Sequence, residues 1–200
     1  MPSDDAVRWN QRYRDASPGW FASPRSFLLN NLQIIPQNGL ALDLAMGIGA
    51  NSSLLIKHGL NVVGIDISSA AVFSAKSTSP DLLAVIADLT RFYLPPQTFD
   101  VVLDFYYLQR NLWPDFARIL KPNGILFFET LTKPMRQIKP EMNPEFLLEP
   151  GELAEAFKDW DILQLHEGLV RSDHGSEKVV ASLIARLPAK LTERGQNVER

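Results

Sequence analysis

Short apolar runs alternate with amphipathic or polar segments along most of this 200-residue chain. A short apolar run bounded by polar or turn residues predicts a buried strand, and apolar residues three or four apart predict a helix. Helices are expected between the apolar runs, including one over 68–77 that Ser68 caps. This alternation predicts an α/β fold with a doubly wound, mostly parallel sheet. The expected strands occupy residues 40–44, 61–66, 81–88, 99–104 and 125–130.

The last third of the chain departs from this alternation. Residues 131–150 contain four prolines and predict a long loop before a helix over 151–160. Residues 161–170 and 177–187 have the composition of strands. The six residues between them are too few for a crossover connection, so an antiparallel hairpin is expected at the end of the chain.

A candidate ligand site lies in the segment LALDLAMGIGAN at 40–51. The apolar run delivers Asp43 into a turn where Gly47 and Gly49 allow the backbone to approach a ligand closely. Asn51 and Ser52 suit the start of the following helix. Asp66 ends the second apolar run, 17 residues after Gly49. A strand, a glycine turn, a helix and an acid-tipped second strand are the elements of a nucleotide-binding βαβ unit.

Asp43 indicates the charge of the ligand. A dinucleotide places its pyrophosphate at the helix N-terminus, where a fixed carboxylate would repel it. The same carboxylate attracts a ligand with a cationic amine or sulfonium, and S-adenosylmethionine carries both. Ser52 also stands where a dinucleotide fingerprint has its third glycine. The alternatives are a helix start that needs small residues, with Asp43 as a capping acid, and a nicotinamide-dependent oxidoreductase.

Composition narrows the class of protein. The chain has no cysteine, which excludes disulfides, a thiolate nucleophile and cysteine-bound metal, and its three histidines lack metal-ligand spacing. With a net charge of −3, the chain lacks the excess of basic residues with which proteins bind the phosphates of nucleic acids. No apolar run approaches a membrane span, and the N-terminus has no signal-peptide core. We expect one domain over 1–200 with a helical cap over 1–35, in a cytoplasmic monomer or homodimer that contacts neither membrane nor nucleic acid.

Together these segments resemble the class I S-adenosylmethionine-dependent methyltransferases. The resemblance runs over nearly the whole chain, from WNQRY at 9–13 through ALDLAMGIGAN, VVGIDIS and FDVVLDFYYLQR to LKPNGILFFET and NPEFLLEPGEL. The aromatic N-terminal segment and the last three motifs are most similar to the tellurite-resistance and related small-molecule branch. The resemblance implies a seven-stranded sheet whose last strand is antiparallel, a cofactor that is S-adenosylmethionine, and no metal.

The resemblance also implies which residues hold the cofactor. Asp43 and the backbone of the turn would bind its methionine end, and Asp66 the ribose hydroxyls. Asp88 would accept from the adenine amino group. Asp66 as a cap for the next helix and Asp88 as a solvated strand end remain alternatives. Alanine at 45, where the family usually has glycine, fits the turn if its φ is negative and strains it otherwise. The implied cofactor residues are Asp43, Ala45, Met46, Gly47, Gly49, Asp66, Ile67, Asp88, Leu89, Asp104 and Phe105.

The methyl acceptor is expected to be a small molecule. Aromatic and arginine side chains after the fourth strand and in the N-terminal cap would line its site, with packing or solvated faces as the alternative. Gln109 stands where the branch often has histidine, and the Asn/Asp-Pro-Pro-aromatic signature of enzymes that methylate nucleic-acid amines is absent after Asp104. The candidate substrate residues are Trp9, Tyr13, Trp20, Phe21, Tyr106, Tyr107, Arg110 and Arg171.

No residue constellation in the sequence indicates a general base or a covalent nucleophile. Methyl transfer from a sulfonium is an in-line displacement for which positioning supplies much of the acceleration. A soft or anionic acceptor, such as a thiol, a thiopurine or a chalcogen oxyanion, would need no base. The other hypothesis is a module that binds S-adenosylmethionine without catalysis.

Overall fold

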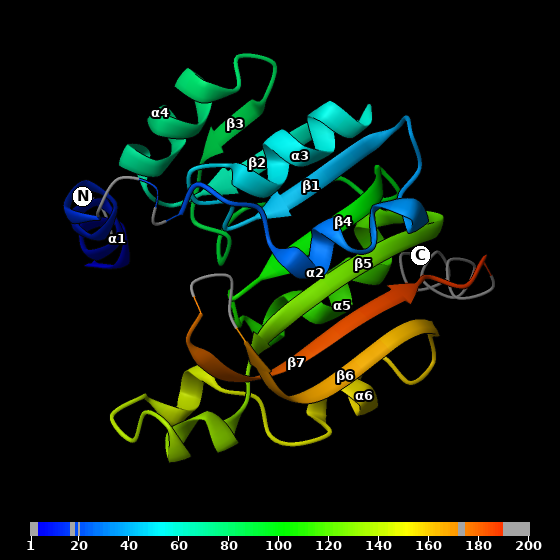
Figure 1. Ribbon diagram of the computed structural model, residues 1–200. Helices are drawn as coiled ribbons and strands as arrows, with labels where there is room; N and C mark the ends of the chain where they lie inside the picture. Colours follow the sequence, from blue (N-terminus) through cyan, green and yellow to red (C-terminus); the bar gives the residue numbers. More distant parts are fainter. Residues whose placement is uncertain (1–3, 17–18, 20, 172–174, 190–200) are drawn as a thin grey trace. The chain divides into compact units, whose positions relative to one another are not determined.

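The computed structural model describes residues 4–16, 19, 21–171 and 175–189, so Trp20 lies outside the described residues. The chain forms two compact units, Met1–Leu94 and Pro95–Arg200, whose elements are labelled in Figure 1. The expectation of one domain with a helical cap over 1–35 remains a prediction. The two units are described in turn.

The first unit is built around three parallel strands in the order β3-β2-β1. Leu40 of β1 is in register with Asn61 of β2, and Val63 of β2 with Leu83 of β3. Helix α3 packs on β1 and β2, α4 packs on β2 and β3, and α1 packs on α4. In chain order the elements are α1 (Asp4–Asp15), α2 (Ser26–Leu29), the 3₁₀ turn η1 (Leu32–Ile34), β1 (Leu40–Leu44), α3 (Ala50–His58), β2 (Asn61–Asp66), α4 (Ser69–Thr78) and β3 (Leu83–Ile86).

Local sequence explains where these elements begin and end. Ser68 caps α4 as expected, because its side chain accepts a hydrogen bond from the Ala71 N–H. Gly59 ends α3 with a φ of 116°, and a Cβ there would lie 2.3 Å from the Gln37 carbonyl oxygen. Glycine is therefore required at this C-cap.

The second unit contains four strands in the order β4-β5-β7-β6. Strands β4 and β5 are parallel, and β7 is antiparallel to both of its neighbours, β5 and β6. Pro114 lies in the first turn of α5, where its missing N–H is harmless. The elements are β4 (Phe99–Phe105), η2 (Arg110–Leu112), α5 (Trp113–Ile119), β5 (Leu120–Leu131), η3 (Lys133–Gln137), η4 (Pro144–Phe146), α6 (Glu152–Ala156), β6 (Asp161–Arg171) and β7 (Glu177–Arg186).

The α/β class, the seven strands and the antiparallel last strand are confirmed. Some boundaries differ from expectation. Strand β3 ends at Ile86, two residues before Asp88. Residues 121–124 (KPNG), which have the composition of a turn, lie within the span of β5, where Asn123 has a φ of 65°. Pairing of β5 with β4 therefore jumps from Leu120 to Ile125, so the turn residues form an irregularity in the strand.

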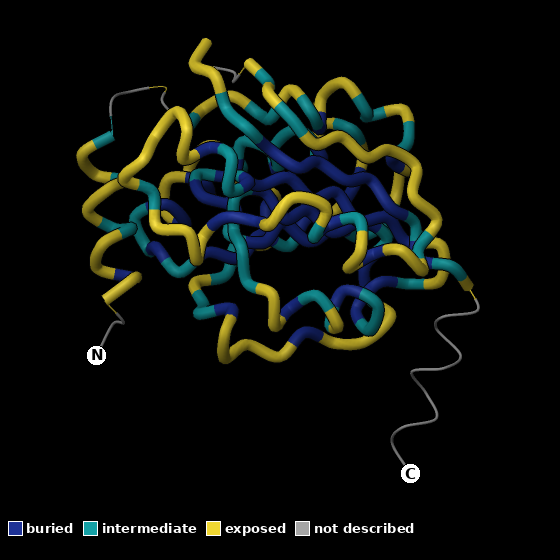
Figure 2. The backbone as a smooth tube through the Cα atoms, turned by 90° about the horizontal axis from the view of Figure 1, so that it is seen from below, coloured by how far each residue is buried: buried dark blue, intermediate teal, exposed yellow. Residues whose placement is uncertain are grey.

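Buried residues concentrate in the strands, as the dark-blue stretches of the tube show in Figure 2. In the second unit, β4 is buried along nearly its whole length, whereas β6 is exposed over most of it. The described helices include none with the length and apolarity needed to cross a membrane.

Candidate functional site

The turn after β1 packs closely against other residues of the first unit. Gly47 and Gly49 have φ values of 58° and 75°, a region that glycine enters without strain. A Cβ on Gly47 would lie 2.6 Å from the Tyr13 hydroxyl oxygen, so a side chain there would displace Tyr13. The turn is also fastened to β2, because the Met46 N–H donates to the Ile65 carbonyl at 3.0 Å.

Ala45 adopts a left-handed conformation in this turn, with a φ of 50°. A residue with a Cβ pays a steric penalty in this region, whereas glycine does not. Alanine was expected to fit this turn only with a negative φ, and the φ of Ala45 is positive. The turn therefore carries strain at the position where the resembling family usually has glycine.

Asp43 is a buried carboxylate on β1, with 1% of its surface exposed. The Ser52 hydroxyl at the start of α3 donates to its Oδ2 atom at 2.6 Å. Burial raises the pKa of Asp43 from 3.8 to about 7, against the opposing effect of the Ser52 hydrogen bond. A nearby positive charge would favour the ionised carboxylate, so this site suits a cationic group.

Asp66 also lies at the turn, and its carboxylate is engaged by backbone donors. The Gly47 N–H donates to Oδ2 and the Ser68 N–H to Oδ1, each at 2.8 Å. Burial raises the pKa of Asp66, while these hydrogen bonds oppose the shift. Asp66 thus bonds to the backbone of Ser68, the N-cap residue of α4, and to the glycine turn. Its contact with a ribose remains a prediction.

Helix α1 is fastened to the same region by Asn10, which the sequence analysis did not single out. The Asn10 Oδ1 atom accepts from the Ser68 hydroxyl at 2.9 Å, the Ser69 hydroxyl at 3.2 Å and the Ala70 N–H at 2.9 Å. One side chain of α1 thereby joins the N-terminus of α4. A polar residue inside an aromatic helical motif was the available signal, but no local pattern indicates its partner.

The aromatic residues of α1 lie beside this anchor. The Tyr13 ring packs against Phe21 and Trp9, with centroid distances of 4.9 and 6.0 Å. Burial and the nearby Asp66 and Asp43 carboxylates raise the Tyr13 pKa above its usual range. Tyr13 therefore stays a neutral phenol next to Gly47. The structure places this predicted substrate residue at the predicted cofactor turn.

The third acid of the series differs from the first two. Asp88 accepts from both the backbone N–H and the hydroxyl of Thr90, at 2.9 and 2.7 Å. These hydrogen bonds lower the pKa of Asp88, which is largely solvated. Leu89 beside it is buried and Ile67 is half-buried. Their contacts with an adenine remain predictions.

In the second unit, the predicted site residues lie at the end of β4 and directly after it. Asp104 and Phe105 are buried at the carboxyl end of the strand. Tyr106, the next residue, donates from its hydroxyl to the Glu129 carboxylate at 2.9 Å. Glu129 also accepts from the Ser182 hydroxyl at 2.8 Å. Glu129 was not predicted as a site residue, because the sequence around a single acid in an apolar strand does not indicate which donors surround it.

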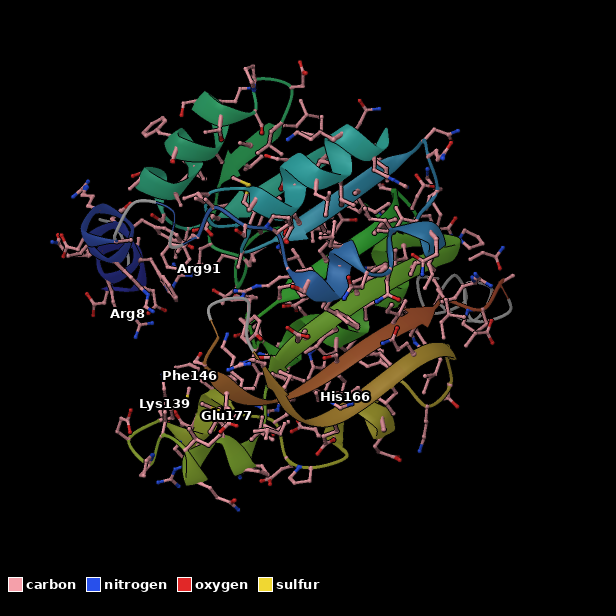
Figure 3. All side chains as sticks on the ribbon, viewed as in Figure 1. Arg8, Arg91, Lys139, Phe146, His166 and Glu177 are labelled. Carbon is pink, nitrogen blue, oxygen red and sulfur yellow. The ribbon has the colours of Figure 1, made fainter. Side chains whose placement is uncertain are left out.

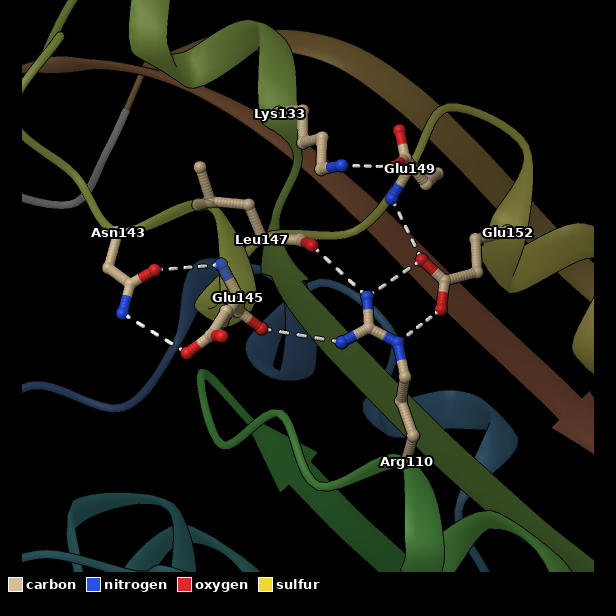
Figure 4. A network of polar contacts seen from close by, with 7 residues as sticks. All are labelled: Arg110, Lys133, Asn143, Glu145, Leu147, Glu149 and Glu152. Carbon is tan, nitrogen blue, oxygen red and sulfur yellow. Dashed lines mark hydrogen bonds and ion pairs between the residues drawn. The ribbon is translucent and has the colours of Figure 1, made fainter.

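Arg110 is engaged by the segment that follows β5 (Figure 4). Its guanidinium forms a bidentate ion pair with Glu152 and donates to the backbone carbonyls of Glu145 and Leu147. Glu152 in turn accepts from the Glu149 N–H at 2.8 Å. In this conformation Arg110 holds the 145–152 segment in place. Its pairing with an anionic acceptor remains a prediction.

The other candidate substrate residues are spread over both units. Arg171 ends β6 and donates to the Gly175 carbonyl at 3.4 Å. Trp9 lies within 6 Å of the guanidinium groups of Arg8 and Arg12. Tyr107 is half-buried in the segment after β4. The roles of all three in acceptor binding remain predictions.

The described residues include histidines, aspartates and glutamates, whose side chains can ligate a metal. His166 projects from the exposed strand β6 (Figure 3), and no cluster of three metal-ligating side chains occurs among the described residues.

Comparison with known proteins finds similarity to methyltransferases. Residues 42–128, which include the glycine turn, β2 and β4, match the family described as a methyltransferase domain. Over 99 residues the chain is 35% identical to a demethylmenaquinone methyltransferase of Beutenbergia cavernae, covering 46% of this chain and 41% of that protein. Over 136 residues it is 32% identical to a trans-aconitate 2-methyltransferase of Escherichia coli O1:K1, covering 60% and 53%.

The solved structures extend the match in fold. TehB from Haemophilus influenzae superposes with a TM-score of 0.68 at 17% identity, covering 90% of this chain and 66% of that one. The chain spans about half the length of the curated relatives it matches. The fold expected from the resemblance is therefore confirmed, and the similarity in sequence is to methyltransferases.

Proposed function

We propose that this chain is a class I S-adenosylmethionine-dependent methyltransferase, which binds S-adenosylmethionine at the glycine turn and transfers its methyl group to a small-molecule acceptor. The observation that carries the proposal is the buried Asp43 carboxylate, which lies beside a turn whose glycines allow the backbone to approach a ligand closely. A burial that raises its pKa to about 7 makes ionisation costly, and a cationic ligand offsets that cost.

The donor set of the first unit fits S-adenosylmethionine. Asp43 would face the methionine ammonium, and Tyr13 supplies a neutral hydroxyl beside Gly47 for its carboxylate. Asp66 would accept from the ribose with lone pairs that the Gly47 and Ser68 N–H groups leave open. When bound, S-adenosylmethionine supplies an activated methyl group on a sulfonium. The role of the protein is then to position donor and acceptor.

We infer that the acceptor is a small organic or inorganic nucleophile, with thiols, thiopurines and chalcogen oxyanions as the first classes to test. The relatives named above act on small molecules according to their names, which supports this size class. Tyr106 and Tyr107, which follow β4, are the aromatic residues of the second unit that would contact the acceptor.

Equilibrium binding tests the cofactor. The wild-type protein should bind S-adenosylmethionine and not NADH, and Asp43→Asn should weaken that binding at least tenfold, which is the effect of losing about 1.4 kcal/mol of charge pairing. Asp81→Asn, an exposed aspartate in the same unit, is the matched control and should leave binding unchanged. Binding of NADH in place of S-adenosylmethionine would contradict the proposal.

Turnover tests the reaction. Formation of S-adenosylhomocysteine is measured against a panel of thiols, thiopurines, chalcogen oxyanions and amines. We expect product with at least one of the first three classes. Tight binding of S-adenosylmethionine with no turnover on any acceptor would identify a binding module without catalysis.

A further inference from the structure

A further buried carboxylate, Glu129, lies near the carboxyl end of β5, in the second unit. Glu129 is 8% exposed, and both of its oxygens accept hydrogen bonds from hydroxyl groups. Tyr106 donates to Oε1 at 2.9 Å and Ser182 to Oε2 at 2.8 Å. The two hydroxyl donors hold this buried carboxylate in a fixed orientation.

Tyr106 is held against Glu129 in an unusual backbone conformation. Its φ of 60° lies in the left-handed region, which is strained for a bulky side chain. The Tyr106 N–H donates to the Glu129 carbonyl at 2.7 Å, so main chain and side chain both bond to the same residue. The Lys178 ammonium lies 4.5 Å from the centre of the Tyr106 ring. The phenol is therefore fixed in position, with a cation on its ring face.

The pair occupies the edge of the strands where this fold class binds ligands. Strands β4 and β5 are parallel, and Phe105 is in register with Glu129. Tyr106 directly follows β4, so both residues stand at the carboxyl ends of their strands. Open α/β sheets bind their ligands at that edge.

We propose that Tyr106 and Glu129 form a proton relay that deprotonates the methyl acceptor, which extends the substrate class to nucleophiles that arrive with their proton, such as alkyl thiols and hydroxyl compounds. This inference rests on the proposed methyl transfer. Tyr106 is the catalytic residue that touches the acceptor, and Glu129 acts through Tyr106. Ser182 positions Glu129.

The step balances in atoms and charge. The acceptor atom forms a bond to the methyl carbon as the carbon–sulfur bond breaks, and the electron pair of that bond stays on sulfur. The acceptor proton passes to the Tyr106 hydroxyl oxygen, and the Tyr106 proton passes to Oε1 of Glu129. The positive charge on sulfur and the negative charge on Glu129 disappear together. Loss of two opposite charges is favourable in a site of low polarity.

Two acceptors separate the relay from a structural role. An alkyl thiol carries its proton at neutral pH, whereas an aryl thiol of low pKa is already ionised. Tyr106→Phe and Glu129→Gln should each slow transfer to the alkyl thiol by about 100-fold to 10,000-fold, the usual contribution of general base catalysis. Transfer to the aryl thiolate should stay within about threefold of wild type, because it needs no base. S-adenosylmethionine affinity and unfolding temperature are measured on the same variants.

Ser182→Ala is the matched control. It removes the other hydroxyl donor to Glu129 but leaves the proton path intact, so it should slow transfer to the alkyl thiol by less than about tenfold and leave transfer to the aryl thiolate within about threefold of wild type. Equal losses on both thiols in Tyr106→Phe and Glu129→Gln would overturn the relay and leave the proposed function standing. Absence of product from every acceptor in the wild type, with S-adenosylmethionine bound, would overturn both proposals.

Discussion

Replacing Asp43 with asparagine should stabilise the ligand-free protein at alkaline pH, even though the same change weakens ligand binding. The buried carboxyl has a pKa of about 7 in the folded chain, against 3.8 when solvated. Between these values the folded state holds a proton that the unfolded state has released. The Asp43 contribution to stability is therefore fully present below about pH 4 and is lost as pH rises through 7.

The magnitude follows from the two pKa values. A difference of about three pKa units corresponds to about 4 kcal/mol of ionisation penalty in the folded state above pH 7. Asparagine cannot ionise, and its side-chain oxygen still accepts from the Ser52 hydroxyl. Asp43→Asn should accordingly raise the free energy of unfolding at pH 8 by at most about 4 kcal/mol, with the gain shrinking toward zero near pH 4.

Urea unfolding of wild type and Asp43→Asn across this pH range gives the difference directly. Asp88→Asn is the control with the opposite sign, because hydrogen bonds from Thr90 lower the pKa of Asp88 in the folded chain. Its ionised form contributes stability above the unfolded pKa, so its replacement should not stabilise the protein at pH 8. A gain for Asp43→Asn that is independent of pH, or no gain at pH 8, would refute the reasoning.

Three further substitutions test the turn and its anchor. Ala45→Gly should relieve the strain of the positive φ, raise the free energy of unfolding by about 1 kcal/mol and tighten S-adenosylmethionine binding. Thermal unfolding and calorimetry measure the two effects, and an unchanged stability and affinity would mean that alanine fits the turn. Gly47→Ala should weaken S-adenosylmethionine binding at least tenfold, because its Cβ meets the Tyr13 hydroxyl. Adding Tyr13→Phe should recover part of the lost stability but not the binding, because the hydroxyl that would contact the ligand is then missing. Asn10→Ala removes three hydrogen bonds and should increase tryptic cleavage within α1 while the β-strands stay protected from hydrogen exchange; equal loss of protection in both would contradict a local anchor.

The strands were predictable because their signal is local. Apolar runs of five or six residues located β1, β2 and β4, and the short connection at 171–176 predicted the antiparallel hairpin. The irregular start of β5 was not predictable from the same signal. There the turn residues around Asn123 lie between the paired positions Leu120 and Ile125, and they form backbone hydrogen bonds with Leu187, which is distant in the sequence.

The site was predictable only where residues near in sequence define it. Asp43, the glycines and Asp66 lie within one βαβ unit, so their spacing sufficed. The partners of Asn10 lie 58 to 60 residues away, and Ser182 lies 53 residues from Glu129. Such pairings arise from the packing of distant elements. The positive φ of Ala45 likewise follows from how the turn is fastened to Asp66 and Ile65.

Proton release on S-adenosylmethionine binding tests most directly whether Asp43 selects a cationic ligand. At about pH 6, below its pKa of about 7, most of the ligand-free protein carries a protonated Asp43. Calorimetric titration in buffers of different ionisation enthalpy should show release of nearly one proton when S-adenosylmethionine binds. Asp43→Asn should show none. Binding without proton release in the wild type, or no binding, would contradict the assignment of this carboxylate to the cationic end of the ligand.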